Sequence, residues 1–466
     1  MKRVLLTVHK FFPEHKAGTE VLTLKVAQEL IRRSYDVLVV TANPPDQDAR
    51  HASGERTTDY VYEGVPVHSI GEPLRLQGFT FAHEFQHPAI AEHFGGIIEK
   101  FQPDLLHIFH AQNLSSSIID KAMEKSLPVV CSTTDFWFVC PIVQLKKPDG
   151  SVCRGPDALA SNCLTCYTPN LLPPKSEFLE ALKKKYPQLQ APLDSSPALM
   201  RDFVENSLFA AYSASKIPSA ASATMQRPGI LRKAANNTKA IMVPTQLMRD
   251  IFVENGIAAE LIKHVPFGID SAPLIPYQRK TESDRLRIGF IGTLFEHKGP
   301  DLLIKAVQSL PESAALELKI YGDPNQFPEY GEFLKNLVAS NARHRDRIQF
   351  LGSFPNDQLG SVLQNMDVLV VPSRWYENTP LVIQSALASK TPLIVTNLGG
   401  MAELIKHNYN GLLFDLNSAD SLAHQIDRLL SEPHLLSSLR ENIAPERTIP
   451  QMVDDIEKVY KEAGNI

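Results

Sequence analysis

The sequence predicts an α/β protein with two domains, each built on a parallel sheet. Three observations predict this class: the length of 466 residues, a hydrophobic content of 43%, and short apolar runs that alternate with helical patterns. One core rarely grows beyond about 250–300 residues, so a chain of this length is expected to divide. Two such domains also imply a cleft between them.

The first domain is predicted for residues 1–270. Apolar runs at residues 4–8 and 37–40 are typical of strands buried on both faces. Between them, apolar residues recur at helical spacing after Thr19, which has the chemistry of an N-cap. Ligands of such β-α-β units bind beyond the carboxyl ends of the strands, so the loop with Gly18 is a candidate cleft wall. A single glycine there equally suits an ordinary turn.

Polar residues follow two further predicted strands of this domain. His110 comes directly after the run 105–109, and Thr134 and Asp135 follow the run 129–131. Side chains at strand ends are more often directed at a ligand than those within a strand, so these three are candidate site residues. His107 lies inside its strand and is expected to be a packed, hydrogen-bonded histidine.

Four of the five cysteines lie within one loop-rich segment, residues 140–166. Cys140, Cys153, Cys163 and Cys166 have the spacing C-x12-C-x9-C-x2-C. Four thiolates can close tetrahedrally around zinc, and a structural zinc would order a segment with little core of its own. Unligated buried thiols and an iron–sulfur cluster are the alternatives.

Residues 173–239 are predicted to form helices broken by prolines, a helical insertion in the first domain. Their apolar residues, among them Phe178, Phe203 and Phe209, are compatible with a face toward the core, an acceptor or a membrane. The amphipathic end of the chain, residues 450–466, is expected to cross back and complete the first domain.

The second domain is predicted for residues 286–445. Its first strand, 286–291, leads into a loop with Gly292, Thr293 and Lys298, and a helix is expected over 300–308. A lysine in that position is suited to a phosphate, although a surface lysine is equally compatible with the pattern.

The most informative stretch is 366–390. An apolar run at 368–371 predicts a buried strand, and the loop after it carries Glu377. Thr379 as N-cap and Pro380 as first helical residue predict a helix over 381–389. The amides of that helix start and the adjacent carboxylate together form an anion-binding arrangement.

Charge and hydropathy exclude several classes of protein. A net charge of −5 argues against a general nucleic-acid binder. The initial apolar run is too short for a signal peptide, and no run approaches the roughly 18 apolar residues of a membrane span. A cytoplasmic protein is expected, which allows peripheral contact with a membrane.

Six segments in order, VHKFFPEHKAGTE, VPFGID, FIGTLFEHKG, VVPSRWYENTPLVIQSAL, GGMAELI and NGLLF, resemble the retaining glycosyltransferases of family 4. The resemblance covers nearly the whole chain. It implies the GT-B architecture, two facing Rossmann-like domains with a deep interdomain cleft. The segment TTDFWFVCP and the cysteines after it resemble a bacterial subset found with surface-polysaccharide enzymes.

The resemblance implies roles for individual residues. Glu377 and Lys298 would be catalytic, Glu377 on the transferred sugar and Lys298 on the diphosphate. His110, Thr134 and Asp135 would lie on the acceptor or sugar side. No catalytic metal would be required. The donor-binding residues would be Gly18, Thr19, Gly292, Thr293, Asn378, Thr379, Pro380, Leu381 and Ser385.

The sequence departs from the family pattern at several of these positions. The second glutamate of the family's E-x7-E pair, which grips the ribose, is Ser385 here. A basic residue is replaced by Thr293, a histidine by Thr134, and a double glycine by Gly18-Thr19. These changes indicate a weakened or altered donor site.

The predicted function is transfer of a hexose-type sugar from a UDP- or GDP-sugar to a glycan or lipid-linked acceptor, with retention, in bacterial surface polysaccharide biosynthesis. The expected location is the cytoplasm, including the inner face of the plasma membrane. Two alternatives remain: a non-catalytic GT-B partner subunit, and a nucleotide-sugar epimerase.

Overall fold

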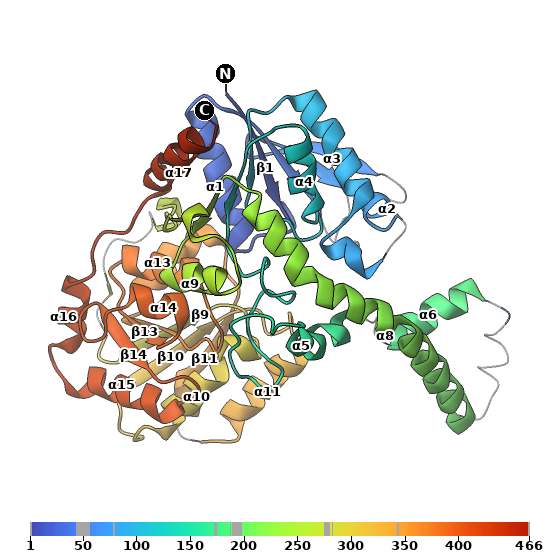
Figure 1. Ribbon diagram of the computed structural model, residues 1–466. Coiled ribbons are helices and arrows are strands. Elements are labelled where there is room, and N and C mark those ends of the chain that lie inside the picture. The colour runs from blue at the N-terminus through green and yellow to red at the C-terminus, as the bar shows by residue number, and fades with distance from the viewer. Residues whose placement is uncertain are drawn as a thin grey trace.

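The computed structural model describes residues 2–42, 56–77, 80–171, 175–186, 188, 198–274, 280–281, 283–342 and 344–464. Within these ranges the chain forms two parallel-rich sheets with helices packed against them (Figure 1). Each sheet lies between two clusters of buried apolar side chains, one on each face. The predicted architecture of two Rossmann-like domains is confirmed.

The first sheet has the strand order β3-β4-β2-β1-β5-β6-β7-β8, and every pair is parallel except β3 with β4. Its strand order reverses between β1 and β5, which places a ligand crevice beyond the ends of these two strands. The strands are β1 (Arg3–Val8), β2 (Asp36–Thr41), β3 (Thr57–Tyr62), β4 (Val65–Ile70), β5 (Leu105–Ile108), β6 (Val129–Ser132), β7 (Ala240–Val243) and β8 (Ile262–His264).

The second sheet is entirely parallel, with the order β11-β10-β9-β12-β13-β14. Its order reverses between β9 and β12, so the loops after these strands meet at one edge. The strands are β9 (Leu286–Ile291), β10 (Leu316–Tyr321), β11 (Ile348–Gly352), β12 (Val368–Val371), β13 (Leu393–Thr396) and β14 (Gly411–Phe414).

Helices cover both sheets. Those of the first domain are α1 (Gly18–Arg32), α2 (Glu72–Arg75), α3 (Pro88–Phe101), α4 (Ser117–Glu124) and α9 (Gln246–Glu254). Those of the second are α10 (Pro300–Ser309), α11 (Pro328–Ala339), α12 (Leu359–Gln364), α13 (Leu381–Ala388), α14 (Gly399–Leu404), α15 (Ala419–Ser431) and α16 (Leu435–Glu441). Short 3-10 turns include η2 (Phe81–Glu84) and η6 (Glu296–Lys298).

Neither threonine predicted as an N-cap takes that position. Ala17 precedes α1 and Pro380 precedes α13, each without a side-chain cap hydrogen bond. Thr19 lies inside the first turn of α1, where its hydroxyl donates to Thr134 Oγ1 at 2.8 Å. A tertiary contact has therefore replaced the local cap at α1.

The C-terminal helix α17 (Ile449–Gly464) packs on the first domain beside α1 (Figure 1). Its apolar face shares a buried cluster with β1. Tyr460 completes a buried chain of hydrogen bonds, because its hydroxyl lies 2.6 Å from His107 Nδ1 and His107 Nε2 lies 2.8 Å from Ser132 Oγ. Burial lowers the pKa of His107 to about 3, so this histidine is a neutral core residue.

Between β6 and β7 the chain forms α5 (Ser161–Leu171), α6 (Lys175–Lys185) and α8 (Ala198–Asn236). The segment forms separate helices as expected, but two of its prolines do not break a helix, since α8 continues through Pro218 and Pro228. Contacts with α5 and η2 outweigh the backbone hydrogen bonds that these prolines remove. Figure 1 shows α6 and the first part of α8 extending away from both domains as an arm.

Candidate active site

A cavity of about 750 Å³ lies between the domains, at the carboxyl ends of both sheets. Lys16, Lys25 and Asp270 line it from the first domain. Four of the predicted donor-binding residues line it from the second domain, namely Gly292, Thr293, Leu381 and Ser385. The cavity thus opens where the strand order of each sheet reverses.

Glu377 is a buried carboxylate in the loop after β12, 8% exposed. Its Oε1 accepts three hydrogen bonds: from Lys298 Nζ at 2.5 Å, from Trp375 Nε1 at 2.7 Å and from Ser373 Oγ at 3.0 Å. Burial by itself raises the pKa of Glu377, but the charge of Lys298 and the three donors outweigh burial and hold the pKa below its ordinary value. The side chain is therefore an ionised acceptor.

Lys298 reaches Glu377 from the loop after β9. This loop ends at Gly299, which has φ +69°, and a Cβ there would lie 2.1 Å from the carbonyl oxygen of Pro372. Only glycine permits this contact between the two loops, because any side chain would push them apart. The Lys298 ammonium also lies 5.2 Å above the ring of Trp375, so the aromatic face contributes to holding it.

A second ion pair ties the same two loops together. Arg374 forms a bidentate pair with Asp301 of α10, at 2.7 and 2.9 Å, and its backbone amide donates to the His297 carbonyl at 2.8 Å. Tyr330 donates to Asp301 as well, at 2.8 Å. Burial raises the pKa of Asp301, but Arg374 and the other donors outweigh it and lower the pKa to about 2. The pair fixes the loop that carries Glu377.

The start of α13 borders the cavity. Leu381 and Val382 line it, and their amides lie in the first turn, where a helix offers no internal acceptor. Thr379 and Pro380 precede this turn. Ser385 also faces the cavity, and its hydroxyl donates to the Leu381 carbonyl at 2.9 Å. The Ser385 hydroxyl proton is therefore already used in a hydrogen bond within the helix and is not offered to a ligand.

Two contacts between predicted residues join the domains. Asn378 Nδ2 donates to the Thr134 carbonyl at 2.9 Å, and Thr134 in turn contacts Thr19. A Cβ on Gly18 would lie 3.8 Å from Leu381, so the first loop packs on the start of α13. Asn378 Oδ1 is buried and has no hydrogen-bond partner among the described residues.

His110, which is buried, and Asp135, which is partly exposed, form a pair at the reversal point of the first sheet. His110 Nε2 lies 2.8 Å from Asp135 Oδ2, while the Gln112 amide donates to His110 Nδ1 at 3.0 Å. Because Nδ1 accepts, the ring proton is assigned to Nε2. The backbone amide of Trp137 donates to Asp135 Oδ1 at 2.9 Å, which orients the carboxylate.

Several residues of the site were not predicted from the sequence. His9, at the end of β1, stacks on His110 with ring centroids 4.2 Å apart and lies 3.5 Å from Glu20. Burial lowers the pKa of His9 and raises that of Glu20. Ser373, Trp375, Arg374 and Asp301 were missed as well. His9 has the same signal as His110, a polar residue directly after a buried strand.

The four cysteines of residues 140–166 lie away from the cleft, around a cavity of about 20 Å³. Cys140 and Cys153 come from loops, and Cys163 and Cys166 from α5. Within the described ranges, no three His, Cys, Asp or Glu side chains stand in a metal-holding group. The zinc site therefore stays a prediction. Cys131, inside β6, is an ordinary buried cysteine.

The sequence matches two family models. The family described as Glycosyl transferase 4-like domain matches residues 17–158, and that described as Glycosyl transferases group 1 matches residues 274–445. The putative glycosyltransferase YtcC of Bacillus subtilis is 29% identical over 232 residues, 45% of this chain and 56% of the relative. The D-inositol 3-phosphate glycosyltransferase of Corynebacterium aurimucosum is 27% identical over 252 residues, 50% of this chain and 59% of the relative. The chain spans about half the length of the curated relatives it matches.

Solved structures share the fold over the full chain. The crystal structure of Anabaena HepE in complex with UDP and glucose has a TM-score of 0.64 at 14% identity and covers 99% of this chain and 100% of its own. Sucrose-phosphate synthase from Thermosynechococcus elongatus has a TM-score of 0.63 at 15% identity, with 99% of both chains covered. In order along the chain, the first domain therefore matches a glycosyl transferase 4-like domain and the second matches the glycosyl transferases of group 1, and both together share the fold of these solved structures.

Proposed function

We propose that this protein transfers a hexose-type sugar from a UDP- or GDP-sugar to a glycan or lipid-linked acceptor with retention of configuration, in bacterial surface polysaccharide biosynthesis. The observation that carries the proposal is the contact between Lys298 and Glu377, which joins a cation and a carboxylate in the loops after β9 and β12. Neither side chain lines the interdomain cavity itself, but Gly292, Thr293 and Leu381 of the same two segments do. The complex of the structurally similar HepE with UDP-glucose supports a nucleotide sugar as donor.

On the donor side, the proposed reaction depends on stabilising negative charge. Breaking the bond between the anomeric carbon and the diphosphate leaves negative charge on the departing group, and Lys298 and the first amides of α13 are placed to stabilise it. All three donors to Glu377 end on Oε1, and no described side chain donates to Oε2. Oε2 is therefore the acceptor offered to a hydroxyl of the sugar. This chemistry requires no catalytic metal.

We place the acceptor side of the proposed reaction on the first domain. His110 and Asp135 stand at the reversal point of the first sheet, with Thr134 bridging toward Asn378 of the second domain. Both ring nitrogens of His110 have partners within the protein, so the histidine orients the Asp135 carboxylate, and this carboxylate is the acceptor offered to a hydroxyl. We assign the acceptor or the transferred sugar to this side.

Ser385 sets an expectation for donor affinity. Its hydroxyl already donates to the helix backbone, so it offers a ribose only an acceptor lone pair. A carboxylate in the same position would accept two stronger hydrogen bonds. The donor site is accordingly weaker on its ribose side, and Lys298 and the α13 amides supply most of the affinity.

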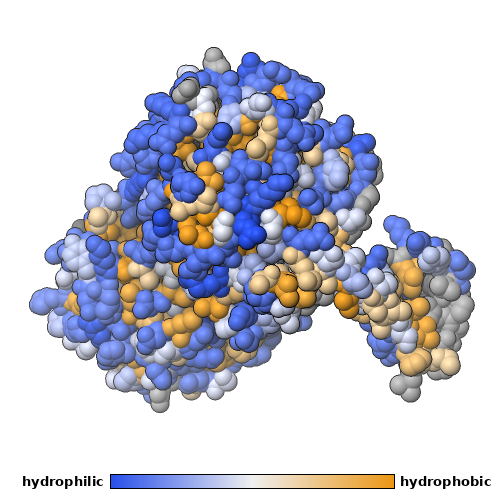
Figure 2. All heavy atoms as spheres, viewed as in Figure 1, coloured by the Kyte–Doolittle hydropathy of each residue, from blue (hydrophilic) through white to orange (hydrophobic). Residues whose placement is uncertain are grey.

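The arm supports contact with a membrane surface. Phe178 of α6 stacks on Phe209 and Tyr212 of α8, whereas Phe203 is 71% exposed. Figure 2 shows apolar residues along the arm among hydrophilic ones. Among the described helices none is long and apolar enough to cross a bilayer. Flotation with anionic vesicles tests this contact, and equal recovery of wild type and Phe203→Ser would contradict it.

The function itself is tested with a panel of UDP- and GDP-sugars, analysed by mass spectrometry with and without lipid-linked glycan acceptors. Sugar added to an acceptor, with the nucleoside diphosphate released, supports the proposal. Conversion of a donor to its epimer without acceptor would indicate an epimerase. Absence of donor binding in calorimetry would indicate a non-catalytic subunit.

A further inference from the structure

The segment that carries four cysteines has little regular structure of its own. Residues 140–160, all of them described, contain turns and one isolated bridge between Lys146 and Val152. A loop of this length within a domain is uncommon and cannot bury much apolar surface by itself. The segment is ordered by contacts with the rest of the first domain, whose core buries Cys140 and Leu145, and a bound metal would add a link within the segment itself.

All four cysteines of the segment surround one small cavity. Cys140, Cys153, Cys163 and Cys166 line a space of about 20 Å³. Cys163 and Cys166 lie three residues apart on α5, so their side chains share one face of the helix. Positions on two loops and one helix thus converge on a volume that suits a single ion.

One of these sulfurs, that of Cys153, already has amide donors beside it. The Gly155 amide lies 3.4 Å from Cys153 Sγ, and Asn162 Nδ2 lies 3.8 Å from the same atom. The Cys153 thiol itself donates to the Gly155 carbonyl at 3.3 Å. Amide donors of this kind stabilise a thiolate ligand and fix its direction.

The loop with Cys153 is firmly anchored to α9. Arg154 pairs with both carboxylate oxygens of Glu254, and Asn255 Nδ2 donates to the Arg154 carbonyl at 2.8 Å. Gly155 has φ +129°, and a Cβ there would lie 2.1 Å from Asn255 Oδ1, so glycine is required. These contacts fix the position of Cys153.

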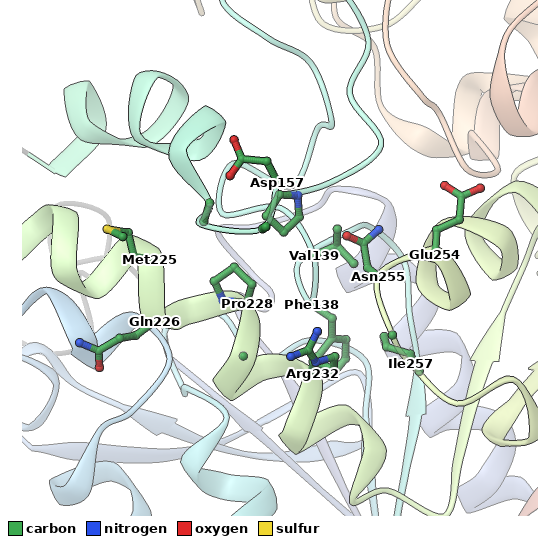
Figure 3. A pocket seen from close by; sticks show the side chains of 15 residues that line it. Phe138, Val139, Asp157, Met225, Gln226, Pro228, Arg232, Glu254, Asn255 and Ile257 are labelled. Atoms are coloured by element: carbon green, nitrogen blue, oxygen red, sulfur yellow. The ribbon is translucent and has the colours of Figure 1, made fainter.

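Figure 3 shows this contact region. Glu254 and Asn255 lie at the end of α9, beside a pocket of about 510 Å³ that Asp157, Pro228 and Arg232 also line. None of the residues that line this pocket also lines the interdomain cleft. The cysteine segment is therefore supported by the first domain, outside the donor site.

The local charge suits a metal bound by four thiolates. Zinc with four thiolates carries a net charge of −2, which needs compensation. Lys146 and Lys147 line the cysteine cavity, and Arg227 lies within electrostatic range of Cys140 and Cys163. Arg227 is paired with Glu84 and Lys146 lies 3.7 Å from Glu296, so Lys147 is the cation of this group without an ion pair to a described carboxylate.

We propose that Cys140, Cys153, Cys163 and Cys166 bind one Zn²⁺ as a closed, structural tetrathiolate site. Binding releases one proton from each thiol, and no electron is transferred. Because these side chains do not stand in a finished metal-holding group among the described residues, binding requires the thiols to rotate toward the cavity. A four-ligand site leaves no position for substrate, which gives it a structural role.

The test is elemental analysis of the full-length protein, purified without chelator or added metal. About one zinc per chain is expected for a structural site. Cys153→Ser and Cys166→Ser should retain less than about a tenth of that, because each removes one of four ligands. Cys131→Ala is the matched control, a buried cysteine outside the segment that should keep the full zinc content.

If the cysteine variants do not fold, a measurement on the wild-type protein still tests the proposal. Treating the wild-type protein with a thiol-blocking mercurial in the presence of a zinc indicator should release about one equivalent of zinc. Cobalt bound in place of zinc should show the thiolate charge-transfer and tetrahedral ligand-field bands. Iron with sulfide, a disulfide among these cysteines, or wild-type protein with less than about a tenth of an equivalent of zinc would overturn the proposal.

Discussion

Lys298 Nζ lies 2.5 Å from Glu377 Oε1, and the two residues come from loops 79 positions apart in the chain. The contact exists because β9 and β12 are neighbours at the reversal point of the second sheet. It keeps a buried carboxylate ionised and holds a cation against it. The pair is the centre of the proposed donor site.

Lys298→Ala and Glu377→Gln should each lower kcat by about a hundredfold, because each removes a group that stabilises developing charge. Initial rates with saturating donor measure the effect. Lys335→Ala, which changes an exposed lysine of α11, is the control and should leave kcat unchanged. Full activity in both site variants would refute the assignment.

Ser385→Ala should raise the donor KM only about two- to tenfold and leave kcat nearly unchanged, since one neutral hydrogen bond is typically worth about 0.5–1.5 kcal/mol. Steady-state kinetics over a range of donor concentrations separates the two constants. Ser437→Ala, on exposed α16, is the control. A loss of kcat near a hundredfold would show that Ser385 has a larger role than the weak ribose contact proposed here.

Asp301→Asn should lower the free energy of unfolding at pH 7 by roughly 2 kcal/mol, the equivalent of depressing the Asp301 pKa from 3.8 to about 2. The folded-state pKa is below the unfolded value. The stabilisation is therefore present above about pH 4 and is lost as the pH falls toward 2. Urea unfolding at several pH values measures it, and a difference between the two proteins that does not shrink at low pH would contradict the account.

His110→Ala should raise the acceptor KM by about tenfold, because it removes the hydrogen bond that orients the Asp135 carboxylate, while donor affinity stays within about twofold. Calorimetry for the donor and kinetics for the acceptor separate the two effects. His434→Ala, an exposed histidine of the second domain, serves as control. Weakened donor binding with an unchanged acceptor KM would move His110 to the donor side.

Glu403 links the domains, because its carboxylate accepts from the amides of Gln246 and Leu247 at the start of α9, at 2.8 and 2.7 Å. Glu403→Ala removes a helix cap worth about 1 kcal/mol and should shift the domains toward a more open arrangement about fivefold. Small-angle scattering without donor should show a larger radius of gyration than for wild type or Glu329→Ala. An unchanged radius would show that other contacts hold the domains.

The sheets were predictable because strands buried on both faces leave unbroken apolar runs, as at residues 368–371. Lys298 and Glu377 were predicted one by one, but their contact depends on which strands are neighbours. Trp375 and the Arg374–Asp301 pair were missed for the same reason, since each acts across two loops. Thr19 is not the cap because α1 already begins at Gly18, and its hydroxyl instead donates to Thr134, which is distant in sequence. Local patterns cannot show such competition.

The measurement that tests the central claim most directly is transfer of labelled sugar from UDP- or GDP-sugars to a lipid-linked glycan acceptor, with the product anomer assigned by NMR. The account predicts a product with the donor's anomeric configuration, made by wild-type protein and reduced about a hundredfold in Lys298→Ala and Glu377→Gln. An inverted product, or no binding and no transfer with any donor, would contradict it.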